Sequence, residues 1–420
     1  MPLAQQILST HAARPVTPGE IVIVPVDGMM ATDATAPFAI KAFRDMGGTR
    51  VCDPARIALV IDHASPAPNE RVANLHRMMR EFAREQGIKL YDVGEGICHQ
   101  LMVENGHVKA GDIFLGADSH TPTYGALGAF AVGVGSTDLA AAMLTGQVWL
   151  KVPQSILIEL DGDLPPGVSA KDVILFLTGK IGADGANYEA VEFTGPLVQR
   201  MTLASRMVLA NMVAEMGAKT AIIDTTGISL TPQPPLPRGE GESDSLSPRE
   251  RVGVREAYKQ TYSFNLSSLR PQIACPPSPD NVKPIDEVIG TKIHAAFIGS
   301  CTNSRLEDLQ AAASVLRGKT LAPGIRLVIA PASRAVFNAA LADGTIQTLS
   351  EAGATFIPSG CGPCVGTHQG VPGDGEVIIS STNRNFPGRM GNPKAEIYLA
   401  SPAVVAAAAV AGEIVEPIFR

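Results

Sequence analysis

Short apolar runs alternate with amphipathic segments along most of the chain. Ile21–Val26 and Ile57–Ile61 have the length and composition of buried strands, and Arg71–Glu85 repeats its apolar residues at helical spacing. Strands that alternate with helices form largely parallel sheets covered by helices, so the pattern predicts an α/β fold. In the second half, strands and helices are predicted in turn at His294–Ile298, Leu306–Leu316, Ile325–Ile329, Ala335–Asp343, Thr355–Pro358 and Glu376–Ser380.

Two stretches interrupt this alternation. Ser229–Glu256 is rich in proline, glycine, serine and alternating charges, and it contains almost no core-forming residue. Because such a segment cannot bury enough apolar surface to offset its ordering entropy, we expect a flexible, solvent-exposed insertion. Pro271–Pro284 is also rich in proline and is predicted to be a linker. The predicted domains are residues 1–153, 154–285 (with the insertion at 229–256) and 286–420.

A glycine-dense stretch, GALGAFAVGVG, covers Gly125–Gly135. It does not fit the dinucleotide-binding fingerprint, because Ser136-Thr137-Asp138 stands where a further glycine is required. We expect the glycines to allow close packing of the backbone instead.

Composition and charge exclude several classes of protein. Of the 420 residues 45% are hydrophobic and only 18% are charged, which favours a globular chain over a disordered one. The net charge of −7 speaks against binding to nucleic acid or to anionic membranes. The apolar run Ala403–Ala411 is far shorter than the ~20 residues of a membrane span, and residues 1–20 lack an apolar signal segment. We therefore expect a cytoplasmic protein with reduced thiols.

Three of the six cysteines follow predicted strands, where α/β sheets place their ligands. Cys301 is followed by Thr302-Asn303-Ser304, which are helix-capping residue types, so nearby backbone amides are expected to lower its pKa. Cys361 and Cys364 stand in the segment PSGCGPCVG. The other three, Cys52, Cys98 and Cys275, are isolated and are predicted to be buried small apolar residues.

Three kinds of site compete for these cysteines. Cys361 and Cys364 match a thioredoxin-type redox pair, although no aromatic residue precedes them. A structural zinc site could add Cys301 and a histidine such as His368, although only one cysteine pair is present. Three thiolates could also hold an iron–sulfur cluster one ligand short of the usual four, leaving one iron open to water or substrate.

Seven motifs follow one another along the chain: GICHQ (Gly96–Gln100), GADSHTPTYGALG (Gly116–Gly128), NMVAEMGA (Asn211–Ala218), IGSCTNSRLEDL (Ile298–Leu309), GCGPCVG (Gly360–Gly366), STNRNFPGRMG (Ser381–Gly391) and YLASPAVVAAAA (Tyr398–Ala409). Together they resemble the aconitase superfamily and, within it, the large subunits of 3-isopropylmalate dehydratases, of the shorter branch that is similar to homoaconitases. The resemblance covers nearly the whole chain except Ser229–Glu256. It implies three α/β domains around an iron–sulfur cleft, without the swivelling domain.

The resemblance implies a hydro-lyase with one [4Fe–4S] cluster held by Cys301, Cys361 and Cys364. One iron, not ligated by cysteine, would take the hydroxyl and a carboxylate of a small hydroxy-diacid. The implied reaction interconverts 2-isopropylmalate and 3-isopropylmalate through 2-isopropylmaleate, in leucine biosynthesis. Homoaconitate or another 2-hydroxy diacid stays open as the substrate. Two other classes are a cluster-sensing RNA-binding regulator, which the acidic balance disfavours, and a zinc-stabilised binding module.

The same resemblance assigns the site residues. Hydroxide is a poor leaving group and needs a Lewis acid together with a proton donor. By resemblance, Asp62 and His63 protonate the departing hydroxyl. Arginines are suited to bind the substrate carboxylates because their charge is permanent and bidentate. The other assignments are His99, Asp118, His120 and Glu215 around the iron-bound oxygen, Arg384, Arg389 and Ser119 on the substrate, and Asn383 on the cluster sulfurs.

The spacing of Asn211 and Glu215 adds a further expectation. Asn211 and Glu215 are four residues apart, so one helix would present both on one face. The remaining histidines are predicted to be surface or core groups: His11, His76, His107, His294 and His368.

Two features depart from the family pattern. Thr32 precedes Asp33 where relatives often carry an amide or a histidine, and its shorter side chain is expected to weaken one polar contact to the substrate. The family's catalytic serine lies in a Gly-Ser-Ser-Arg-Glu-like loop, and the nearest sequence here is Ser267-Ser268-Leu269-Arg270. By resemblance, a separate small subunit carries that loop, so we expect a heterodimer in which the small subunit supplies the serine.

Overall fold

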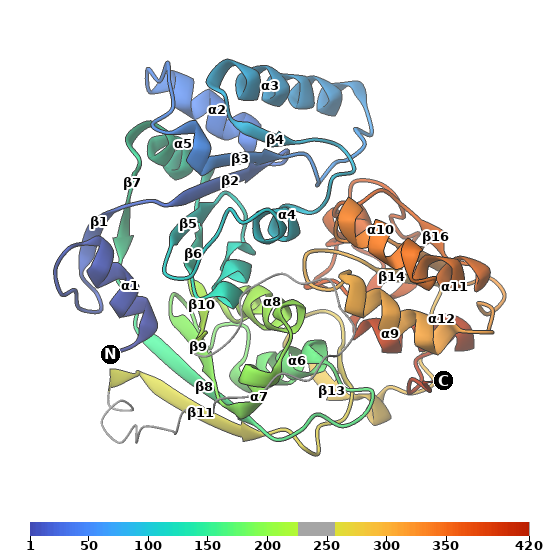
Figure 1. Ribbon diagram of the computed structural model, residues 1–420. Helices are drawn as coiled ribbons and strands as arrows, with labels where there is room; N and C mark the ends of the chain where they lie inside the picture. Colours follow the sequence, from blue (N-terminus) through green and yellow to red (C-terminus); the bar gives the residue numbers. More distant parts are fainter. Residues whose placement is uncertain (226–256, 420) are drawn as a thin grey trace.

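Three parallel or mainly parallel sheets organise the computed structural model, which describes residues 1–225 and 257–419. Figure 1 shows them in the upper, lower and right-hand parts of the molecule, with helices packed around each. This arrangement confirms the predicted α/β class. The predicted insertion, Ser229–Glu256, lies outside the described residues.

The first sheet is five-stranded and parallel, in the order β4-β3-β2-β5-β6. The predicted helix Arg71–Glu85 is α3, which starts after Asn69, whose side chain accepts from the Val72 N–H, and ends at the left-handed Gly87. The strands are β2 (Gly28–Thr32), β3 (Ile57–Val60), β4 (Lys89–Tyr91), β5 (Ile113–Gly116) and β6 (Phe130–Gly133). The helices are α1 (Leu3–His11), α2 (Ala36–Asp45), α3 (Glu70–Gln86), α4 (Cys98–Glu104) and α5 (Ser136–Thr145).

The predicted strand Ile21–Val26 is present but does not join this sheet. As β1 (Ile21–Pro25) it pairs antiparallel with β7 (Gln147–Lys151) in a separate two-stranded ribbon. Its residues alternate between exposed and buried, the pattern of a strand with one solvent face.

The second sheet is four-stranded and parallel, in the order β10-β9-β8-β11. Helix α6 begins with a capping box in which Ser169 and Asp172 bind each other's backbone N–H groups. The strands are β8 (Ser155–Asp161), β9 (Ala190–Thr194), β10 (Thr220–Ile223) and β11 (Gln260–Asn265). The helices are α6 (Ala170–Ile181), α7 (Pro196–Arg200) and α8 (Leu203–Met212), and 3-10 turns occur at η2 (Thr121–Leu127) and η3 (Val213–Met216).

The third sheet has seven strands, in the order β13-β12-β18-β17-β14-β15-β16. The predicted helix Leu306–Leu316 is α9, with the same bounds. The strands are β12 (Gln272–Ala274), β13 (Val282–Pro284), β14 (Ala295–Ile298), β15 (Arg326–Ile329), β16 (Thr355–Phe356), β17 (Val377–Ser380) and β18 (Glu396–Leu399). The other helices are α10 (Arg334–Ala342), α11 (Thr345–Glu351) and α12 (Pro402–Ala411).

The prediction that Pro271–Pro284 is a linker is wrong. It carries β12 and β13, which pair antiparallel with each other, and β12 continues the sheet beside β18. The short run Gln272–Ala274 is buried, and the Asp172 carboxylate accepts from the Gln272 N–H at 2.9 Å. The proline content conceals a strand of three residues because those residues are stabilised by distant partners.

The apolar segment near the C-terminus is α12, which is buried on most sides in the core of the third sheet. None of the described helices is both long enough and apolar enough to cross a membrane.

The glycine-dense stretch packs as expected. A Cβ on Gly125 would lie 1.8 Å from the carbonyl oxygen of Ala221, and one on Gly133 would lie 2.7 Å from that of Asp118. Both neighbours are backbone atoms, which cannot rotate away. The glycines therefore let η2 lie directly against β10 and let β6 approach the loop after β5.

We expect Gly125→Ala to lower the free energy of unfolding by about 1–3 kcal/mol, because the new methyl group forces η2 away from β10. Gly373→Ala is the matched control: it lies on the surface with negative φ and no atom within 3.4 Å of a new Cβ. Chemical denaturation of both variants measures the difference. Equal stability of the two would contradict the packing argument.

Candidate active site

Three buried cysteines from two loops line one cavity. Cys301 follows β14, and Cys361 and Cys364 flank the start of a 3-10 turn, η6 (Gly362–Val365), that follows β16. The cavity has a volume of about 90 Å³, and all three thiols line it. None of the three forms a disulfide. Sulfur atoms from stretches 60 residues apart are thus brought to one point.

The isolated cysteines differ from expectation in two ways. Cys275 is buried as predicted, but Cys52 is exposed, so its predicted burial is wrong. Cys98 is buried and also lines the thiol cavity. It stands at the start of α4, and its N–H donates to Asp62 at 2.7 Å. The sequence does not indicate this because the contact joins residues from two separate βα loops.

Burial dominates the chemistry of the thiols. It raises the pKa of Cys301 to about 12, with the Asp118 carboxylate and Cys364 adding to the effect. The expected lowering of this pKa by a helix start is therefore wrong. Helix α9 begins only at Leu306, and the amide next to it, on Arg305, donates to Asp308 at 3.0 Å.

Polar hydrogens nevertheless point at the sulfur atoms. The side-chain amides of Asn211 and Asn383 donate to Cys301 Sγ at 3.2 and 3.4 Å. The Arg389 guanidinium donates to Cys364 Sγ at 3.5 Å, and its Nε is buried with no partner among the described residues. Donors of this kind stabilise thiolates rather than thiols. The cavity therefore fits a cationic metal group that replaces the thiol protons.

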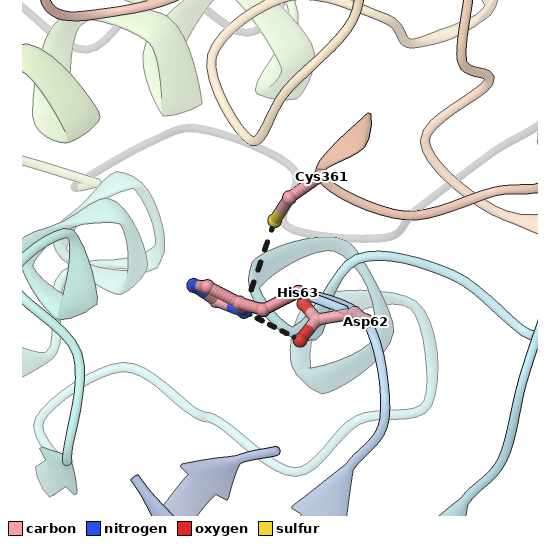
Figure 2. Close-up of side chains that lie close together, drawn as sticks. All are labelled: Asp62, His63 and Cys361. Atoms are coloured by element: carbon pink, nitrogen blue, oxygen red, sulfur yellow. Dashed lines mark hydrogen bonds and ion pairs between the residues drawn. The ribbon is translucent and has the colours of Figure 1, made fainter. Parts of the chain in front are cut away.

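A carboxylate–imidazole pair lies beside Cys361. His63 Nδ1 is 2.8 Å from Asp62 Oδ1 and 3.8 Å from Cys361 Sγ, as Figure 2 shows. Burial alone would lower the pKa of His63, but the sulfur and the carboxylates of Asp62 and Asp118 outweigh it and raise this pKa well above its usual value. The three ligand atoms are close enough to hold a metal ion. In the metal-free chain they keep a protonated imidazole at the cavity.

Asp118 is the centre of a second group. Its carboxylate lies 2.9 Å from His99 Nε2 and 3.4 Å from His63 Nε2, and it accepts from the His120 N–H at 2.8 Å. Burial opposes ionisation, yet His99 and the bonds from His120 and His63 hold the pKa of Asp118 well below its usual range. The other ring nitrogen of His99, Nδ1, lies 3.0 Å from the Tyr124 hydroxyl, which fixes the orientation of the ring.

Glu215 links His120 to Arg384. Its carboxylate lies 2.9 Å from His120 Nε2 and accepts from Arg384 Nε at 3.0 Å. Although burial raises its pKa, these two partners lower it on balance. Helix α8 ends at Met212, between Asn211 and Glu215. A 3-10 turn, η3, continues directly from α8 through Glu215, so the two residues do not share one α-helix, although both side chains reach the site, Asn211 at Cys301 and Glu215 at His120.

The structure thus brings together the residues that the sequence assigns. Asp62 and Glu215 do not line the thiol cavity. They bind His63 and His120, which do. Of the assigned residues, those that line the cavity itself are His63, His99, Asp118, Ser119, His120, Cys301, Cys361, Cys364, Asn383, Arg384 and Arg389.

Asp33 is a site residue that the sequence analysis does not assign. It lies at the end of β2, where its carboxylate accepts from the N–H groups of Asp62, His63 and Ala64 at 2.8–3.0 Å. His76 from α3 lies 3.2 Å from the same carboxylate. Asp33 therefore fixes the backbone of the Asp62–His63 loop. An acidic residue directly after a strand is the signal that could have pointed to it.

The remaining predicted positions have structural partners. Thr32 is fully buried and lies 3.3 Å from the Thr35 hydroxyl, so it does not line the thiol cavity. His368 approaches the carbonyl oxygen of His63 at 2.8 Å. His11, His107 and His294 bind Asp27, Tyr91 and the Val377 N–H, away from the cavity.

Comparison with known proteins finds relatives that all carry names from one family. The family profile "Aconitase family (aconitate hydratase)" matches residues 5–294 and 287–412. "3-Isopropylmalate dehydratase large subunit 1" of Methanopyrus kandleri is 47% identical and is aligned over 99% of this chain and 98% of its own length. The protein of the same name from Pyrococcus furiosus is 46% identical over the same shares. "Probable methanogen homoaconitase large subunit" of Methanosarcina mazei is 47% identical over 94% of this chain and 99% of its own.

A solved structure supports the fold alone. Aconitase X of Thermococcus kodakaraensis, in its holo-form, superposes with a TM-score of 0.50 over 91% of this chain and 89% of its own, at 15% identity. The family profile and the near full-length relatives show that the chain belongs to the aconitase family.

Proposed function

We propose that this chain is the large subunit of a 3-isopropylmalate dehydratase, a hydro-lyase that interconverts 2-isopropylmalate and 3-isopropylmalate through 2-isopropylmaleate. The observation that carries the proposal is the meeting of three buried thiols with two carboxylate–histidine groups and two arginines in one cavity. The names of the near full-length relatives support this substrate. Homoaconitate is the second candidate, because relatives of equal similarity carry homoaconitase names.

Cys301, Cys361 and Cys364 would hold a [4Fe–4S] cluster, with Asn383 and Asn211 bonded to its sulfur ligands. With only three thiolates the cluster supplies a Lewis-acid iron that is open to a substrate hydroxyl. The donors that face Cys301 and Cys364 support this assignment, because they would remain bonded once the thiol protons are lost.

His63 is proposed as the proton donor to the departing hydroxyl. Its raised pKa keeps the imidazole protonated at neutral pH, and Asp62 and the backbone held by Asp33 fix the ring direction. Asp118, His99, His120 and Glu215 would form the network that accepts and returns protons. The contacts of 2.9 Å within the His99–Asp118 pair and within the His120–Glu215 pair support proton transfer inside each pair.

Arg384, Arg389 and Ser119 are proposed to bind the substrate carboxylates. In the hydrogen bonds of the described residues, Arg384 uses Nε for Glu215, which leaves its terminal amino groups for a carboxylate. Arg389 lies close to Cys364 and so places a fixed positive charge next to the proposed cluster. Guanidinium groups are suited to the negative charge that builds on a carboxylate when the neighbouring carbon loses a proton.

The proposed partner is a small subunit that supplies the catalytic serine. A second cavity, of about 690 Å³, shares Asp118, Ser119 and Arg384 with the thiol cavity. This wider space would admit a loop of a second chain to the substrate. The "large subunit" names of the relatives are consistent with such a partner.

Cys361→Ser should abolish cluster binding. After anaerobic reconstitution we expect about four iron and four sulfide per wild-type chain, and close to none in the variant, because two thiolates do not hold a cubane cluster. The matched control is Cys98→Ser, since Cys98 lines the same cavity but is not a proposed ligand. Iron and sulfide analysis decides: loss of the cluster from both variants, or from neither, would contradict the ligand assignment.

Turnover should require the partner. With a cognate small subunit, the reconstituted chain is expected to isomerise 2-isopropylmalate at least about 10²-fold faster than alone, because the partner supplies the general base. The absorbance of the unsaturated intermediate measures the rate, and homoaconitate is assayed in parallel. Equal rates with and without the partner would overturn the proposed division of labour, and a preference for homoaconitate would select the second candidate.

Asp62→Asn should change the pH profile. Activity requires protonated His63, so it falls as the pH rises through the raised pKa of that residue. Removing the carboxylate at Asp62 lowers this pKa, and the alkaline decline should move down by about 1–3 pH units. Asp374→Asn is the control, because Asp374 pairs with Lys394 at the exposed surface. An unshifted decline in Asp62→Asn would exclude His63 as the proton donor.

A further inference from the structure

Lys171 is a fully buried cation that the proposed chemistry does not use. It lies in the first turn of α6 and is 0% exposed. Its ammonium donates to the carbonyl oxygens of Ser381 and Thr382 at 2.9 and 2.5 Å. Throughout residues 1–225 and 257–419, no carboxylate oxygen within 4 Å pairs with it. Such burial without an ion partner costs several kcal/mol, so another interaction must offset it.

The local surroundings make the placement less favourable still. The first turn of a helix carries the positive end of the helix dipole, which disfavours a cation. The neighbouring carboxylate, Asp172, is occupied by the N–H groups of Ser169 and Gln272. Burial accordingly lowers the pKa of Lys171 to about 7, and the negative groups Asp308, Cys301, Cys364 and Glu215 oppose that shift.

Two of these four negative groups already have cations of their own. Glu215 binds Arg384 and His120, and the Cys364 sulfur accepts from the Arg389 guanidinium. The Cys301 sulfur differs, because the groups that donate to it are the neutral amides of Asn211 and Asn383. The Arg305 guanidinium donates to the Cys301 carbonyl oxygen at 2.9 Å rather than to the sulfur, so among the described residues no cation would be hydrogen-bonded to a Cys301 thiolate.

The loop between Lys171 and the thiols connects the two. Ser381 and Thr382, whose carbonyls bind the ammonium, directly precede Asn383 on the loop after β17. Asn383 in turn donates to Cys301 and lies 4.0 Å from Cys364 Sγ. The ammonium and the two cysteines thus contact successive residues of one short loop, residues 381–383.

We propose that Lys171 is the buried counter-charge of the iron–sulfur group. Its ammonium acts across the backbone of residues 381–383, offsets the negative charge of the thiolates and cluster, and fixes the loop that presents Asn383 and Arg384. Lys171 touches no substrate and is a positioning residue. The inference rests on the proposed function, because only a bound cluster keeps these thiols ionised.

The test replaces Lys171 by methionine, which keeps the length and removes the charge. We expect the reduction potential of the bound cluster in Lys171→Met to become more negative, because a nearby positive charge favours the reduced form. We also expect a chelator to remove the cluster about tenfold faster. A tenfold change is about the size expected for the loss of one charge–charge interaction at an effective dielectric constant between those of the protein interior and water. The drop in melting temperature should be larger for the cluster-loaded protein than for the apo-protein.

Two further variants isolate the charge. Lys171→Arg keeps it and should hold the potential at the wild-type value, whatever its bulk does to the melting temperature. Lys219→Met is the matched control, because Lys219 also donates to a backbone carbonyl, that of Gly133, and has a pKa lowered by burial. It should lower the melting temperature of loaded and apo-protein equally and leave the potential unchanged.

The outcomes separate the inference from the function on which it rests. An unchanged potential in Lys171→Met, with equal losses of melting temperature in both forms, would overturn the inference and leave a purely structural lysine. A wild-type chain that takes up no cluster would overturn the proposed function and this inference together. If Lys171→Met does not fold as the apo-protein, Lys171→Gln, which also removes the charge, takes its place, and an unchanged potential of its cluster would overturn the inference.

Discussion

The removal of charged groups from water is the constraint on which the site depends. Asp62, Asp118 and Glu215 are at most about one-eighth exposed at their side chains, so each must find its partner inside the protein. The partners are histidines and an arginine that also line the cavity. An isolated carboxylate there would become protonated, and an isolated imidazole would lose its proton. The network therefore sets the charge of each member, and removing one member changes the ionisation of the others.

The fold meets this constraint by ending several parallel strands at the same place. Asp33 follows β2, Asp62 follows β3 and Asp118 follows β5, all in the first sheet. Cys301 and Asn383 follow β14 and β17 in the third sheet. The carboxyl ends of parallel strands are where α/β proteins place ligands, because the loops there converge. The acidic side of the site thus comes from one sheet and the sulfur side from another, with Glu215 contributed by the turn after α8.

Much of this could be predicted from the sequence, because the signals are local. The helix Leu306–Leu316 has the predicted bounds, and the cysteine motifs indicate their own loops. Three features that the sequence analysis missed depend on distant contacts. The strand at Gln272–Ala274 is stabilised by β18 and Asp172, the role of Asp33 depends on three amides about 30 residues away, and burial at the meeting of two loops raises the pKa of Cys301. Periodicity and motif spacing do not report such contacts.

The high pKa of Cys301 and the donors that face it indicate how a metal group would bind: it would displace the thiol protons. In the apo-protein the Cys301 thiol stays protonated, because burial raises its pKa more than the amides of Asn211 and Asn383 can lower it. A metal group that displaces the protons must therefore release them, and its binding is stronger at higher pH. The amides and Arg389 need not move when this happens, since they already point at the sulfur atoms. The cavity is thus prepared for a charge that the apo-protein does not carry. This preorganisation explains why the buried Arg389 guanidinium donates to Cys364 before any metal group is bound.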